Sequence, residues 1–163
     1  MYCTICGSDL ELRTIVNEGD IPFCRKCDKL FFPRVNLAMI AILTNTKNQI
    51  CLINQKGASE YKVLLAGYIK PGETLEECVK REIAEEVGLD IIKCEYLNSH
   101  YYDKSEVLMV GYHALTNQSN FKIDEDEVDN ANWYELDDAI GRIREGSIAY
   151  LLVEQYLKNL KIL

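Results

Sequence analysis

Three glutamates, Glu82, Glu85 and Glu86, have the type and spacing of a divalent-cation site. Residues at positions i, i+3 and i+4 share one face of a helix, so the three carboxylates would repel one another. They would also crowd the last helical turn, where the macrodipole disfavours anions. Carboxylate oxygens suit the hard ions Mg²⁺ and Mn²⁺, which also bind substrate phosphates. The pattern therefore predicts a metal site or, as the simpler alternative, a solvated acidic face.

The helix that would position these glutamates has sequence signals at both ends. Pro71-Gly72 predicts a turn, and Thr74 precedes Glu77 by three residues, the spacing of a capping box. Apolar residues then recur every four positions, and Gly88 follows the last of them, where a helix commonly ends. We therefore expect a helix over 74–87. Its expected apolar stripe is Leu75, Val79, Ile83 and Val87.

The whole stretch 67–89 matches the Nudix box at every defined position. That pattern reads Gly, five residues, Glu, seven residues, Arg-Glu, an aliphatic, any residue, Glu-Glu, any residue, Gly and an aliphatic. Here the defined positions are Gly67, Glu73, Arg81, Glu82, Ile83, Glu85, Glu86, Gly88 and Leu89. The chain thus resembles the Nudix hydrolases, which cleave a nucleoside diphosphate linked to another group. The resemblance implies an α/β fold, the Nudix α/β/α sandwich with a mixed sheet, and leaves a Nudix fold without catalysis as the alternative.

The resemblance also assigns roles in metal binding and catalysis. The implied catalytic set is Arg81, Glu82, Glu85, Glu86 and Glu127, and the implied Mg²⁺ or Mn²⁺ ligands are Glu82, Glu85, Glu86, Glu127 and the main-chain carbonyl of Ala66. Two or three ions would neutralise the diphosphate and lower the pKa of a bound water, whose proton would pass to Glu85 or Glu127. We expect Arg81 to pair with Glu73 and to hold the loop against the helix. A solvated charge is the alternative for Glu127.

Four of the seven cysteines form two C-x2-C pairs, Cys3 with Cys6 and Cys24 with Cys27. This spacing is typical of a structural Zn²⁺ site, in which four thiolates bind one ion. We expect residues 1–33 to form a zinc ribbon of two short hairpins that depends on the metal for its fold. Ordinary thiols, a redox pair and bound iron are the alternatives. The odd cysteine total and the lack of a signal peptide indicate a reducing, cytoplasmic setting.

Length and composition limit the remaining possibilities. A chain of 163 residues with 48% hydrophobic content supports one core domain, expected over 34–163, and a small appendage. The net charge of −8 argues against a broad surface for long nucleic acid. No apolar run approaches the length of a membrane span. Strands are expected over 35–44, 49–55, 61–66, 91–101, 106–115 and 131–134, the first two as a hairpin, with a loop over 57–60 and an acidic loop over 117–130. Helices are expected over 137–143 and 147–160, the second with an apolar side formed by Ile148, Leu151, Leu152, Tyr156 and Leu160.

A zinc ribbon directly before a Nudix domain resembles the NADH pyrophosphatases. Supporting matches lie at Leu65-Ala66-Gly67, at Asn132-Trp133-Tyr134, at Phe32-Pro33 and over 146–149. Longer members of that group carry a further N-terminal domain, which we expect to be absent here. The group resemblance also suggests a homodimer.

One loop departs from that group. The NADH pyrophosphatases carry a Ser-Gln-Pro-Trp-Pro-Phe-Pro signature that is associated with NADH selectivity, and residues 99–106 of this chain replace it. An aromatic residue, Tyr102, keeps the Trp position and could stack on a base. The candidate substrate contacts are Phe32, His100, Tyr101, Tyr102 and Ala149. Ordinary packing is the alternative for the two tyrosines. His113 lies in an apolar stretch and is expected to be a hydrogen-bonded core residue.

The expected substrate is therefore a small NAD(H)-like dinucleotide, cleaved to AMP and nicotinamide mononucleotide. ADP-ribose or another ADP-sugar is the first alternative, because the same box serves a different sugar pocket. A nucleotide-sensing or nucleic-acid-binding module with an inactive Nudix domain is the second. An NAD-linked RNA end would undergo the same chemistry.

Overall fold

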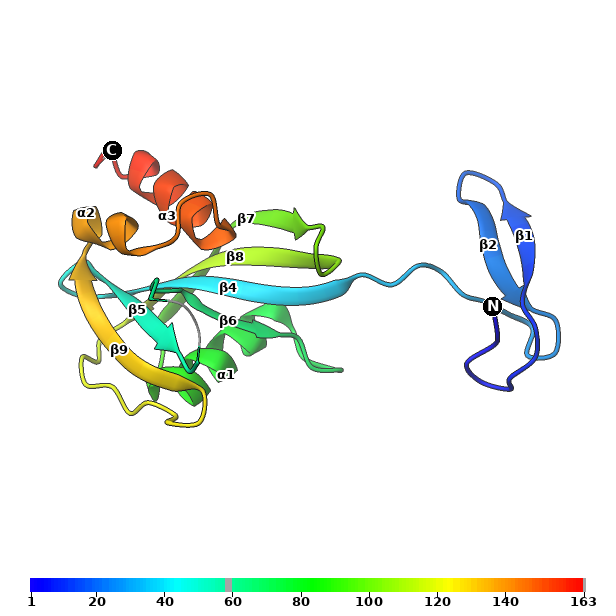
Figure 1. Ribbon diagram of the computed structural model, residues 1–163, viewed down its shortest axis with the longest axis horizontal. Helices are drawn as coiled ribbons and strands as arrows, with labels where there is room; N and C mark the ends of the chain where they lie inside the picture. Colours follow the sequence, from blue (N-terminus) through cyan, green and yellow to red (C-terminus); the bar gives the residue numbers. More distant parts are fainter. Residues whose placement is uncertain (58–59, 163) are drawn as a thin grey trace. The chain divides into compact units, whose positions relative to one another are not determined.

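The computed structural model describes residues 1–57 and 60–162 and divides the chain into two compact units, Met1–Val35 and Asn36–Leu163 (Figure 1). Of the loop expected over 57–60, residues 58–59 lie outside the described part. None of the described helices is long and apolar enough to cross a membrane.

The N-terminal unit is a small antiparallel sheet in the order β1-β2-β3. Its strands are β1 (Glu11–Ile15), β2 (Gly19–Cys24) and β3 (Lys29–Leu30). A bridge between Tyr2 and Asp9 closes the first C-x2-C turn into a short hairpin. Only Ile21, Phe23 and two cysteines are buried apolar residues in this unit. Because this buried apolar surface is small, it contributes little to the stability of the unit. The unit therefore needs another source of folding free energy.

The C-terminal unit is built on a six-stranded mixed sheet in the order β7-β8-β4-β5-β9, with β6 also paired to β4. The strands are β4 (Asn36–Asn45), β5 (Gln49–Gln55), β6 (Leu65–Tyr68), β7 (Lys93–Tyr102), β8 (Val107–Thr116) and β9 (Val128–Glu135). β4 and β8 are parallel, and the other neighbours are antiparallel. The hairpin expected from β4 and β5 pairs only at Thr44 and Ile50, because β4 pairs mainly with β6 and β8.

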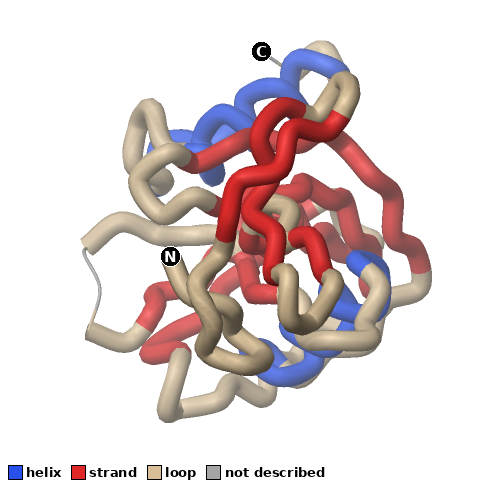
Figure 2. The backbone as a smooth tube through the Cα atoms, turned by 90° about the vertical axis from the view of Figure 1, so that its right-hand side faces the viewer, coloured by secondary structure: helices blue, strands red, loops and turns tan. Residues whose placement is uncertain are grey.

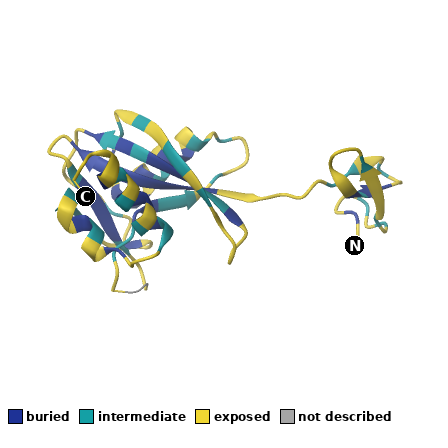
Figure 3. Cartoon of the chain, turned by 90° about the horizontal axis from the view of Figure 1, so that it is seen from above, coloured by how far each residue is buried: buried dark blue, intermediate teal, exposed yellow. Residues whose placement is uncertain are grey.

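Helices cover both faces of this sheet (Figures 1 and 2). α1 (Leu75–Val87) packs on one face, and α2 (Leu136–Ala139), the 3₁₀ helix η1 (Ile140–Arg142) and α3 (Ile148–Asn159) lie on the other. Alternate side chains of β4 serve the two cores: Met39, Ala41 and Leu43 face α1, whereas Ile40 and Ile42 face α3. Figure 3 shows the buried strands between exposed outer surfaces. The expected α/β/α sandwich with a mixed sheet is confirmed.

The predicted limits of α1 are also confirmed. The Thr74 hydroxyl accepts a hydrogen bond from the Glu77 amide while the Glu77 carboxylate accepts one from the Thr74 amide, which completes the capping box. Gly88 ends the helix in the left-handed conformation with φ 68°. The apolar side predicted for α3 is shifted. Leu151 and Leu160, expected on that side, are 40% and 45% exposed, and the residues that are buried are Ala149, Leu152, Val153 and Leu157.

Candidate active site

Glu82 lies directly against the backbone of β6. A Cβ atom added at Gly67 would be only 2.0 Å from the Glu82 Cδ atom. No other residue type leaves room for the carboxylate there, so the glycine that starts the Nudix box is required by close approach rather than by a turn. The Glu82 side chain extends from α1 onto β6 and is 12% exposed, so the packing of helix and strand fixes its position.

Arg81 connects the loop before α1 to two of the candidate ligands. Its guanidinium donates to both Glu73 oxygens, at 2.7 and 3.0 Å, to Glu82 at 2.6 Å and to Glu85 at 2.8 Å. The expected Arg81–Glu73 pair is therefore present. Hydrogen bonds from Arg81 lower the pKa of Glu73 to about 2 and also lower the pKa of Glu85. The Arg81 guanidinium also donates to the Tyr68 carbonyl at 3.1 Å, which links β6 to this side chain.

Glu86 is the most unusual carboxylate of the site. It is 4% exposed, and its Oε2 atom has no hydrogen-bond partner among the described residues. Burial, together with the charges of Glu82 and Glu127, raises its pKa to about 8, although a hydrogen bond from the Ala66 backbone acts in the opposite direction. Mg²⁺ and Mn²⁺ prefer carboxylate oxygens as ligands, and a bound cation would supply the partner that the buried Glu86 oxygen lacks among the described residues. These residues therefore fit a divalent cation.

The acidic loop between β8 and β9, residues 117–127, contacts the end of α1 through its backbone. The amide of Lys122 donates to the Val87 carbonyl at 2.9 Å, and the amide of Asp124 donates to the Glu86 carbonyl at 3.2 Å. These bonds satisfy carbonyls in the last turn of α1 that have no partner within the helix. The loop is thereby held so that the exposed Glu127 acts electrostatically on Glu86.

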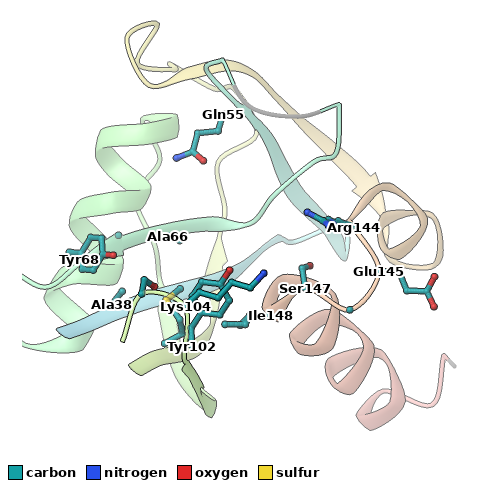
Figure 4. Close-up of a pocket in the computed structure, with 14 residues that line it drawn as sticks. Ala38, Gln55, Ala66, Tyr68, Tyr102, Lys104, Arg144, Glu145, Ser147 and Ile148 are labelled. Carbon is teal, nitrogen blue, oxygen red and sulfur yellow. The ribbon is translucent and has the colours of Figure 1, made fainter. Parts of the chain in front are cut away.

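A pocket of about 800 Å³ opens on the α3 side of the sheet and is lined in part by Ala66 and Tyr68 of β6 (Figure 4). A smaller one of about 210 Å³ is lined by Glu86 and Ala149 and shares Gln55 and Ala66 with the larger pocket. The larger volume lies in the range of pockets that hold drug-sized ligands. The buried carboxylate and a nucleotide-sized pocket are thus neighbours in space.

The predicted substrate contacts divide around this pocket. Tyr102 lines it, and Ala149 lines the smaller one. Tyr101 lies on the opposite face of β7, because successive strand residues alternate, and is 53% exposed. His100 lies on the same face as Tyr102 and has a buried Nε2 atom without a partner in the described part of the chain. Phe32 belongs to the N-terminal unit and is half exposed, so its role stays a prediction.

Several pocket residues were missed in the sequence. They are Ala38, Gln55, Tyr68, Lys104, Ser105, Met109, Arg144, Glu145, Ser147 and Ile148. One local signal was available, since Gly146 and Ser147 form a turn and an N-cap before α3, with φ 75° at the glycine. No sequence spacing indicates that Lys104 and Arg144, from separate loops, line one pocket.

The four ribbon cysteines lie together. Their sulfur atoms all lie within 4.8 Å of one another, with 3.9 Å between Cys3 and Cys27 and 3.6 Å between Cys6 and Cys24. A tetrahedral ion with Zn–S bonds of about 2.3 Å requires sulfur separations of about 3.8 Å. The thiols therefore fit Zn²⁺. No other group of three candidate ligands within residues 1–57 and 60–162 is spaced as closely, and this includes the Nudix glutamates.

His113 is the hydrogen-bonded core histidine that was predicted. Its Nε2 atom lies 2.8 Å from the Thr44 hydroxyl and 3.2 Å from the Tyr156 hydroxyl. Burial lowers its pKa, so the neutral form is favoured.

Comparison with known proteins agrees with this geometry. The family model described as "NUDIX domain" matches residues 34–154. Two proteins named NAD-capped RNA hydrolase NudC, from Stutzerimonas stutzeri and Pseudomonas aeruginosa, are 32% and 29% identical over 156 residues, which is 96% of this chain and 55% of each relative. The chain thus spans about half the length of these curated relatives.

Solved structures show the same fold. A NUDIX hydrolase from Nitrosomonas europaea has a TM-score of 0.71 and 18% identity, over 97% of this chain and 90% of that one. The NUDIX domain of Shewanella oneidensis NrtR, solved with ADP ribose, has a TM-score of 0.65 and 21% identity, over 85% of this chain and 94% of that one.

Proposed function

Because the chain belongs to the NUDIX family, we propose that it hydrolyses the diphosphate bond of a nucleoside diphosphate linked to a second group, with Mg²⁺ or Mn²⁺ as cofactor. The observation that carries this proposal is the buried Glu86 carboxylate, whose Oε2 atom has no hydrogen-bond partner within residues 1–57 and 60–162. Glu86 lines the small pocket that shares Gln55 and Ala66 with the pocket of about 800 Å³. A buried carboxyl group whose pKa is strongly raised is typical of a functional site.

The glutamates would divide the work according to their surroundings. Glu82 and Glu86 are held rigidly and would bind the cations, with the Ala66 carbonyl and Glu127 as further ligands. Bound Mg²⁺ or Mn²⁺ would neutralise the diphosphate and lower the pKa of a water. Glu85 is half exposed and has a lowered pKa, so it is ionised and able to accept the proton of that water, a role that Glu127 could share. Arg81 would position Glu82 and Glu85 without touching the substrate.

The proposed substrate is an NAD(H)-like dinucleotide, cleaved to AMP and nicotinamide mononucleotide. Three observations support it: a pocket of about 800 Å³, Tyr102 on its wall as a stacking surface, and curated relatives that are named for hydrolysis of NAD-capped RNA. The same linkage occurs at the 5′ end of such an RNA, so a capped end is the second candidate.

The two units would have separate tasks. Residues 1–33 would form the zinc ribbon, with Cys3, Cys6, Cys24 and Cys27 as ligands of one structural Zn²⁺. Residues 34–163 would form the hydrolase domain. Four thiolate ligands leave the zinc no open position for a substrate, so the hydrolytic chemistry belongs to the second domain alone.

Mass spectrometry of products tests the substrate. The full chain, supplied with Mg²⁺ or Mn²⁺, is incubated with NADH, NAD⁺, ADP-ribose and a short NAD-capped RNA. The highest kcat/KM on an NAD-type compound, releasing AMP or a 5′-monophosphate RNA, supports the proposal, whereas faster cleavage of ADP-ribose would replace it with an ADP-sugar hydrolase. Tyr102→Leu should raise KM several-fold, and Tyr101→Leu, on the opposite face of the same strand, is the matched control.

A further inference from the structure

Two cationic side chains line the part of the pocket next to α3. Lys104 lies in the turn between β7 and β8, and Arg144 lies just before α3. Figure 4 shows them on separate walls, with Lys104 beside Tyr102 and Arg144 above Ser147. The two loops are 40 positions apart in sequence, so the fold, and not local chain geometry, places both charges at one pocket.

Neither cation is held by a carboxylate in the part of the chain that the structure describes. Within the described residues, neither Lys104 nor Arg144 forms an ion pair, whereas Arg142, two residues away, is bound to Asp138 at 2.7 Å. The chain carries a net charge of −8, so carboxylate partners are plentiful. Glu145 also lines the pocket, but it makes no ion pair with any described residue. The donors of Lys104 and Arg144 are therefore available to a ligand.

The diphosphate does not need these donors. Under the proposed function its charge is neutralised at the glutamate cluster, and the pocket meets that cluster through Ala66 and Gln55. Lys104 and Arg144 line the larger pocket but not the smaller one that contains Glu86. An anion bound by them would thus be a different group of the same substrate.

We propose that Lys104 and Arg144 select substrates that carry a further phosphate beyond the scissile diphosphate. Arginine presents a planar fork that matches phosphate oxygens, and lysine adds a compact positive charge. Two sources share this chemistry. One is a phosphate monoester on the ribose, as in NADP(H), and the other is the phosphodiester that joins an NAD cap to the next nucleotide. The inference rests on the proposed function, because it assumes that the diphosphate lies at the glutamates.

Paired substrates distinguish these sources. The kcat/KM is measured for NADPH against NADH, and for NAD⁺ joined through its 3′ oxygen to one nucleotide against NAD⁺. Loss of a hydrogen bond to a charged group typically costs about 10- to 100-fold. We expect at least a 10-fold preference for one phosphorylated member in the natural chain, given as the ratio of kcat/KM within each pair, and a ratio close to one in Lys104→Gln/Arg144→Gln. Lys47→Gln/Lys161→Gln makes the same charge change at exposed positions outside the pocket and should keep the preference.

Two outcomes overturn the inference. One is equal turnover of both members in each pair by the natural chain, and the other is a double variant that loses NADH and NADPH turnover equally, which would place the cations on the shared diphosphate. Calorimetric binding of NADP⁺ and NAD⁺ to Glu86→Gln gives a readout that needs no turnover. Tighter NADP⁺ binding without hydrolysis of any compound by the natural chain would refute the proposed function and retain the pocket selectivity.

Discussion

Replacing Glu86 with glutamine should stabilise the protein when no divalent cation is present. The ordinary pKa of a glutamate is 4.5, and the folded surroundings of Glu86 raise it to about 8. Between these values the unfolded chain has released the proton that the folded chain still holds. The stability of the folded state therefore falls as the pH rises from 4.5 toward 8. Glutamine has the same shape and no such titration.

The size of the effect comes from the same shift. One pKa unit corresponds to about 1.4 kcal/mol, and the gap from 4.5 to pH 7 is about 2.5 units, so Glu86 should cost about 3 kcal/mol of unfolding free energy at pH 7. Near pH 4.5 the two proteins should differ little. The 4% exposure of Glu86 justifies the use of the shift without a large correction for solvent.

Urea unfolding followed by tryptophan fluorescence measures this difference. The chain has a single tryptophan, Trp133, which stacks on Phe121 with ring centroids 5.0 Å apart and donates from its indole nitrogen to the Ser119 carbonyl at 2.9 Å. Its signal therefore reports on the C-terminal unit alone. Added Mg²⁺ or Mn²⁺ should then stabilise the natural chain and not Glu86→Gln, because the ion binds only the folded state.

Glu85→Gln is the matched control. Glu85 lies one position earlier, is half exposed and has a lowered pKa, so its replacement should not stabilise the protein at any pH. Equal stability of Glu86→Gln and the natural chain at pH 7, or a stability difference that does not grow between pH 4.5 and 7, would refute the reasoning from burial.

Three further predictions concern the supports of the site. Gly67→Ala should lower kcat on the order of 100-fold with an unchanged circular dichroism spectrum, because its Cβ would displace Glu82; near-normal kcat would contradict this. Arg81→Lys should reduce the unfolding free energy by about 2–3 kcal/mol in the same urea assay, since lysine lacks the fork that bridges Glu73 and Glu82, both at most 13% exposed; a change below about 0.5 kcal/mol would argue against it. Zinc chelation should speed hydrogen exchange over 1–30 and leave the Trp133 transition in place, and unaltered exchange would show that the ribbon folds without metal.

Local signals explain why the helix and its glutamates were predictable. The capping box at Thr74, the left-handed glycine at 88 and the apolar repeat all act within a few residues. The match to the Nudix box then predicted Glu82 and Glu86 as metal ligands, and this role stays a prediction. Burial of Glu86, however, depends on β6 and on the acidic loop, and neither contact is visible in the helix sequence.

Long-range pairing explains what was wrong or missed. The strands at 36–45 and 49–55 and their antiparallel pairing were predicted correctly, but most of the backbone partners of both strands come from elsewhere in the chain and have no local sequence signal. The apolar side of α3 was misplaced because aliphatic residues surround that helix on several sides, and only the sheet decides which are buried. Lys104 and Arg144 have no common pattern in sequence, and the meeting of two loops alone makes them neighbours of one pocket.

The backbone bonds between the acidic loop and α1 bear on how the sequence of this loop could change over time. Lys122 and Asp124 contribute their amides, which every residue except proline possesses. These two bonds therefore do not depend on the side chains at 122 and 124, whereas a residue inserted between Lys122 and Asp124 would move one of the amides away from its carbonyl on α1. Other acidic or neutral residues at these two positions would thus leave the backbone contact beside Glu86 intact, while an insertion between them would disturb it.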